Sequence, residues 1–83
     1  MDKITVDIRF FGAFRTFGRD VVLSLPLGSN LVAVKQALIA KIGKDQELLV
    51  NDSVLADSVH ILPETYIIEE NCCLSILPPV CGG

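Results

Sequence analysis

Residues 4–27 read ITVDIRFFGAFRTFGRDVVLSLPL, and this stretch decides the fold. Apolar and polar residues alternate at both of its ends. The apolar positions are Ile4, Val6, Ile8, Phe10, Val21, Leu23, Leu25 and Leu27. A period of two is typical of strands that bury one face. The short connection 12–18 has glycine at both ends, so we predict an antiparallel hairpin. Pro26 lacks a backbone N–H, which places it in an edge strand or at a strand end.

The segment that follows has the period of a helix. Four apolar residues recur at helical spacing: Leu31, Val34, Leu38 and Ile42. Polar residues are expected elsewhere on the circumference: Lys35, Gln36 and Lys41. Asn30, or Ser29 if the start shifts by one, is a suitable N-cap. Gly43 stands where a left-handed C-cap glycine belongs. The sequence therefore predicts one amphipathic helix between Asn30 and Gly43.

The rest of the chain predicts short extended segments. These are Glu47–Val50, Ser53–Val59, Tyr66–Ile68 and Cys73–Leu77, the last of which ends at two prolines. An amphipathic helix must bury its apolar stripe against a sheet. A right-handed crossover would then return the last strand beside the first, parallel to it. We predict an α+β fold of the β-grasp (ubiquitin-like) kind, with a mixed sheet packed on one main helix. It spans residues 1–77, and 78–83 form an extended, flexible Gly-Gly tail.

Size and composition limit the functional classes. The chain has 83 residues, of which 51% are hydrophobic and 20% charged, as expected for one globular domain. Its apolar runs are too short to cross a bilayer, and Met1-Asp2-Lys3 does not open a signal peptide. We therefore expect a cytoplasmic protein without a membrane partner. The net charge is −3 and no basic cluster is visible in the sequence. This argues against nucleic acid and favours a partner with a basic surface.

The cysteines do not indicate a metal site or a disulfide framework. Cys72, Cys73 and Cys81 are odd in number, and no C-x-x-C pair is present. Cys72 and Cys73 fall on opposite faces of the last predicted strand, so one of them is expected in the core. His60 is expected to be a solvated loop residue. We predict no bound metal and no bound cofactor.

The C-terminal residues 77–83, LPPVCGG, carry the functional signal. Two prolines impose an extended conformation, and two glycines have no side chains. Such a tail can enter a narrow channel and present its terminal carboxylate to an enzyme. Adenylation by ATP would activate this carboxylate, and attack by sulfide or persulfide would give a thiocarboxylate. We predict Gly83 as the reacting residue with Gly82 beside it. The residues that thread the channel would be Pro78, Pro79, Val80 and Cys81.

Residues 76–83, ILPPVCGG, resemble the C-terminus of molybdopterin synthase small subunits. Residues 8–15, IRFFGAFR, are similar to that family's first strand and following turn. The resemblance implies a sulfur carrier that is not an enzyme on its own. It implies that an adenylating enzyme related to ubiquitin activators would use ATP to convert Gly83 to a thiocarboxylate. A cysteine desulfurase or a rhodanese would supply the sulfur.

The resemblance also implies the working assembly. In a heterotetramer with two large synthase subunits, Gly83 would donate sulfur to cyclic pyranopterin monophosphate during molybdenum cofactor biosynthesis. Two departures from the family pattern are visible. Cys81 stands where the family more often has Ser, Ala or Thr; it is either a small residue that fits the channel or a carrier of a persulfide or mixed disulfide. The segment 59–64 is longer than a minimal member needs.

A docking surface is expected from the aromatic residues. Four phenylalanines are too many for the core of a domain this small, so some should be exposed. The predicted docking residues are Phe14, Phe17, Leu74 and Ile76.

Three other functions stay open. One is a sulfur carrier of the thiamin pathway, although those carriers usually lack the double proline. Another is a ubiquitin-like modifier whose activated Gly83 is captured by a lysine. The last is a β-grasp binding module whose tail is inert. Blocking the terminus would leave only the binding module working.

Overall fold

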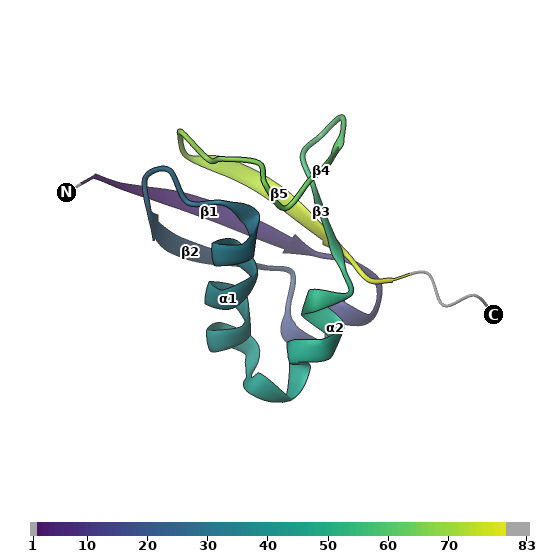
Figure 1. Ribbon diagram of the computed structural model, residues 1–83. Coiled ribbons are helices and arrows are strands. Elements are labelled where there is room, and N and C mark those ends of the chain that lie inside the picture. The colour runs from purple at the N-terminus through teal and green to yellow at the C-terminus, as the bar shows by residue number, and fades with distance from the viewer. Residues whose placement is uncertain (1, 80–83) are drawn as a thin grey trace.

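The computed structural model describes residues 2–79 and shows a mixed sheet with helices on one side (Figure 1). The strands are β1 (Lys3–Phe10), β2 (Asp20–Pro26), β3 (Val54–Ala56), β4 (Ile61–Leu62) and β5 (Cys72–Leu77). The helices are α1 (Leu31–Ile42) and α2 (Glu47–Asn51), with 3₁₀ turns η1 (Gly12–Phe17) and η2 (Lys44–Gln46). Within the described residues, the strand order is β2-β1-β5-β3-β4.

The first hairpin and the last strand form as predicted. β1 and β2 pair antiparallel, with Val6 opposite Leu23, and β2 is an edge strand that ends at Pro26. β5 lies parallel to β1, with Ile8 opposite Leu74. β3 pairs antiparallel with the other side of β5. The β-grasp prediction is therefore confirmed at the level of strand order and direction.

The core lies between the sheet and α1. The alternating apolar residues of β1 are buried, and so are Leu31, Val34 and Leu38 of α1. The Asn30 side chain caps α1 by accepting a hydrogen bond from the Ala33 N–H at 3.0 Å, as predicted. Gly43 has the expected positive φ of 116°, but its ψ of 143° lies outside the left-handed helical region that we predicted.

Three local predictions downstream of α1 need correction. Residues 47–50 belong to the short helix α2, because the buried Val50 packs into the core from a helical turn. The predicted strand at 66–68 is only an isolated bridge between Asn30 and Ile67. Its backbone instead bonds the turn before α1, where the Ile68 N–H donates to the Ser29 carbonyl at 2.8 Å. The extended part of 53–59 is confined to β3, and β4 follows it.

The long segment that follows β3 is organised by Asp57. Its Oδ1 accepts hydrogen bonds from the backbone N–H groups of His60 at 2.6 Å and Val59 at 2.8 Å. These two bonds lower the pKa of the Asp57 carboxyl, because they favour its ionised form. The side chain of His60 is exposed, as the sequence predicts. The turn brings β4 back alongside β3.

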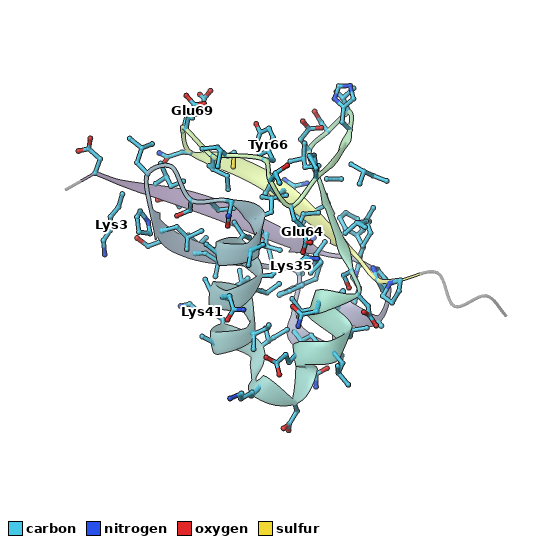
Figure 2. All side chains as sticks on the ribbon, in the orientation of Figure 1. Lys3, Lys35, Lys41, Glu64, Tyr66 and Glu69 are labelled. Atoms are coloured by element: carbon cyan, nitrogen blue, oxygen red, sulfur yellow. The ribbon has the colours of Figure 1, made fainter. Side chains whose placement is uncertain are left out.

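Lys35 is buried, contrary to the sequence prediction. It follows Leu31 by one helical turn and therefore lies on the inner side of α1. Its ammonium group donates to the carbonyls of Ser53 at 2.7 Å and Asn51 at 3.3 Å. It also forms an ion pair with Glu64 at 3.4 Å, and Figure 2 shows these two labelled side chains together. Lys35 thus connects α1 to the chain that enters β3.

Replacing Lys35 by methionine is expected to lower the free energy of unfolding by about 1–3 kcal/mol, since two backbone carbonyls lose their buried donor. Urea denaturation of both proteins measures the difference. The matched control is Glu64→Gln, which removes the ion pair from the other side. Because the Glu64 side chain is 62% exposed, the control should cost no more than about 1 kcal/mol. An equally stable Lys35→Met protein would show that apolar packing replaces the ammonium group without loss.

Candidate functional site

The candidate site is the end of the sheet where the C-terminal segment leaves the domain. Because β1 and β5 are parallel, their carboxyl ends lie at the same end of the sheet, with Phe10 opposite Ile76. β5 ends at Leu77, where Pro78 and Pro79 begin. Proline cannot donate to a strand ladder, so the pairing stops there. Figure 1 shows the yellow end of β5 next to the place where β1 leads into η1.

Gly12 lies against Pro78, where the chain leaves the sheet. Its φ is +59°, a conformation that other residues adopt only at a cost. A Cβ atom at this position would lie 2.7 Å from Cγ of Pro78, which is closer than carbon atoms can approach. The backbone at Gly12 therefore forms a close-fitting seat for the Pro78 ring. The sequence offered one signal for this contact, a glycine directly after a strand, but nothing in it pointed to Pro78.

The prediction of a docking surface is wrong for three of its four residues. Phe14, Leu74 and Ile76 are buried, and Phe17 is half-buried against the core. Phe14 turns inward because η1 folds back over the end of the sheet. Its ring centroid lies 6.2 Å from that of Phe10 and 6.4 Å from that of Phe17. Leu74 and Ile76 are inward because they occupy alternate positions of β5.

The residues that the structure does expose near the site are different ones. Phe11, which follows β1, is 39% exposed, and so is Val54, the register partner of Leu77. Neither was in the predicted docking set. Pro78 and Pro79 are half-buried. Exposed and half-buried apolar residues thus lie beside the point where the tail begins.

The two adjacent cysteines divide between the two faces of β5 as predicted. Cys72 packs against the core, and Cys73 is exposed. Burial raises the pKa of the Cys72 thiol, and the neighbouring Cys73 and Glu70 add to this effect. A raised pKa lowers the thiolate fraction, so Cys72 is a weak nucleophile.

Solved structures with the same architecture decide the fold class. A Pyrococcus furiosus protein provisionally named molybdopterin converting factor, subunit 1, superposes with a TM-score of 0.76 at 16% identity; the match covers 93% of this chain and 99% of that one. Ubiquitin from Caldiarchaeum subterraneum matches with a TM-score of 0.68 at 15% identity over 99% of this chain and 100% of its own. The chain has the ubiquitin-like β-grasp fold.

A third solved structure, the HVO 2177 protein of Haloferax volcanii, matches with a TM-score of 0.72 at 19% identity. It covers 98% of this chain and 88% of that one. No protein-family model matches the sequence, and no curated protein is significantly similar to it. At these sequence identities, the comparisons show that the proteins share a fold.

Only some of the predicted reacting and threading residues belong to the part of the chain that the structure describes. Pro78 and Pro79 are in place at its end, whereas Val80, Cys81, Gly82 and Gly83 lie outside the described residues. Among residues 2–79, no three His, Cys, Asp or Glu side chains gather as metal ligands would. None of the helices in this same part of the chain is long and apolar enough to cross a membrane.

Proposed function

We propose that this protein is a sulfur carrier that reacts through the carboxylate of Gly83, as the small subunit of molybdopterin synthase. One observation carries the proposal: β5 ends beside the end of β1, and Pro78 there packs against Gly12. A rigid starting point lets a short segment deliver its last residue to a defined place in a partner. The sequence of that segment, VCGG, has small residues next to the proposed reacting carbon.

The chemistry proceeds in two displacements. The Gly83 carboxylate attacks the α-phosphorus of ATP and releases pyrophosphate, which gives an acyl adenylate. Hydrosulfide then attacks the carbonyl carbon and expels AMP, which leaves a thiocarboxylate and one proton. If a protein persulfide attacks instead, the acyl disulfide that forms is reduced by a thiol to the same product. The carrier supplies the carboxylate, and its adenylating enzyme supplies the catalytic groups.

The proposed acceptor is cyclic pyranopterin monophosphate, held by the large synthase subunit into which Gly82 and Gly83 insert. The Pro-Pro-Val segment before Cys81 supports this acceptor over a thiamin precursor. The two acceptors differ in chemistry, so incubation of the thiocarboxylate form with each purified acceptor system distinguishes them. Formation of a dithiolene from the pterin supports the proposal, and transfer only to a thiazole precursor replaces it with the thiamin carrier.

A protein modifier is the second candidate, and its support is the likeness to Caldiarchaeum ubiquitin. In that case the activated Gly83 carbonyl is attacked by a lysine amine, and an isopeptide bond forms with loss of AMP. Both functions share the adenylation step. They differ in whether Gly83 ends on sulfur or on another protein.

The proposal is tested by intact-mass spectrometry of the protein purified from a native-like host. The mass is measured before and after incubation with ATP, a sulfur donor and the adenylating enzyme. We expect the mass increase of exchanging one oxygen for one sulfur, located at Gly83 by fragmentation. Covalent conjugates through Gly83 without this increase would establish the modifier. An unchanged Gly83, under conditions that convert a known carrier, would leave the β-grasp domain as a binding module.

A further inference from the structure

All three arginines of the chain gather around one hollow at the end of β1. The hollow has a volume of about 530 Å³ and is lined by Arg9, Phe10, Phe11, Arg15, Arg19 and Asp20. Arg9 comes from β1, Arg15 from η1, and Arg19 from the residues before β2. The three arginines are separated in the sequence, and only the turn of the hairpin brings them together. For this reason no basic cluster was visible in the sequence. The expectation that the chain has no basic cluster is therefore wrong at this end of the sheet.

The guanidinium groups of this arginine hollow form no ion pair with any residue in the described range 2–79. Both ion pairs found among residues 2–79 involve Lys35 or His60 rather than an arginine. Asp20 is the register partner of Arg9 in the β1–β2 ladder, yet the two side chains form no ion pair there. Three positive charges thus face one carboxylate, in a chain whose net charge is −3. This local excess attracts anions.

The arginine hollow adjoins the start of the tail. Phe11 lines the hollow, and the next residue, Gly12, contacts Pro78. Both features lie at the end of the sheet where β1 and β5 terminate side by side. A protein that receives residues beyond Pro79 would therefore meet the hollow as well.

We propose that the arginine hollow binds a carboxylate-rich segment of the adenylating enzyme, the protein that first receives the tail. The proposal deepens the function proposed above and rests on it. Guanidinium groups pair with carboxylates through two parallel hydrogen bonds, which fixes orientation as well as affinity. The three arginines come from separate segments, so each guanidinium group can pair with a different carboxylate of one acidic peptide. The hollow orients the partner, and the tail then enters its site.

The test uses NMR of the isotope-labelled protein titrated separately with a hexaglutamate peptide and with inorganic tripolyphosphate. We expect the peptide to shift the amides of Phe11, Arg15 and Arg19 in a saturable, salt-sensitive way. The double variant Arg15→Gln/Arg19→Gln should weaken peptide binding at least about tenfold. The matched control Lys41→Gln/Lys44→Gln removes the same charge from the distant end of α1 and should change it less than about twofold. Retained amide dispersion shows that each variant is folded.

Two results of the titration would overturn the proposal. Tighter binding of tripolyphosphate than of the peptide would make the hollow a polyphosphate site. The absence of localised shifts with either probe would show that the hollow does not bind anions.

Kinetics with the adenylating enzyme test the identity of the partner. The arginine double variant should raise the KM for the carrier at least about tenfold and leave kcat unchanged, because the lost contacts act in binding. If the double variant has the same KM as the parent protein, the hollow does not bind the adenylating enzyme. If Gly83 is never activated, the function proposed above fails instead, and the peptide titration still reports on the hollow by itself.

Discussion

Deletion of Gly83 is expected to abolish thiocarboxylate formation and sulfur transfer. The deletion leaves a glycine carboxylate, but the chain is shorter by about 3.5 Å. A displacement of even about 1 Å from the reacting geometry can reduce a rate by a factor on the order of one hundred. The mass increase described above and the yield of dithiolene product measure the two steps. We expect neither to exceed the background without carrier.

The fold should not depend on Gly83. Since the β-grasp core is formed by residues within 4–76, the free energy of unfolding should stay within about 0.5 kcal/mol of the parent value. Extension by one further glycine is the matched control, because it keeps the Gly-Gly pair and displaces the carboxylate in the other direction. It should fail in the same assays. Sulfur transfer by the truncated protein would contradict the assignment of Gly83.

Substitution of Gly12 by alanine is expected to destabilise the domain and to disturb the start of the tail. The left-handed φ of +59° alone costs roughly 1–2 kcal/mol for a residue with a Cβ. The new Cβ would also meet Pro78 Cγ at 2.7 Å, so the proline ring or the turn must move. We expect a total loss of about 2–4 kcal/mol in the free energy of unfolding. Sulfur transfer should fall as well, because the tail would leave in another direction.

A matched control separates the backbone cost at Gly12 from the contact with Pro78. Gly28 also has a positive φ, +87°, but a Cβ there would meet nothing within 4 Å. Gly28→Ala should therefore lose stability without losing sulfur transfer. In a double-mutant cycle, Pro78→Ala should recover part of the loss caused by Gly12→Ala, because the smaller side chain removes the clash. Additive effects of the two substitutions would mean that the Gly12–Pro78 contact does not govern the tail.

The local pattern of the sequence determined the elements that depend on neighbouring residues. Alternation marked β1 and β2, because successive side chains of a strand point to opposite faces. Asn30 marked the start of α1, since its side chain caps an N–H of the first turn. Pro78 and Pro79 marked the end of β5 by removing donors from the ladder. The glycine tail, which carries the proposed chemistry, was likewise read from adjacent residues.

Only the tertiary structure decided which residues meet across the fold. Residues 47–51 are too few to show a helical period, and the burial of Val50 made them helical. Lys35 was expected in solvent, but the carbonyls of Asn51 and Ser53 hold its ammonium group inside. The contact between Gly12 and Pro78 joins segments that are distant in the sequence. The arginine hollow joins segments that are separated by a turn. Such contacts depend on strand order and on the path of the connecting turns, which local periodicity does not encode.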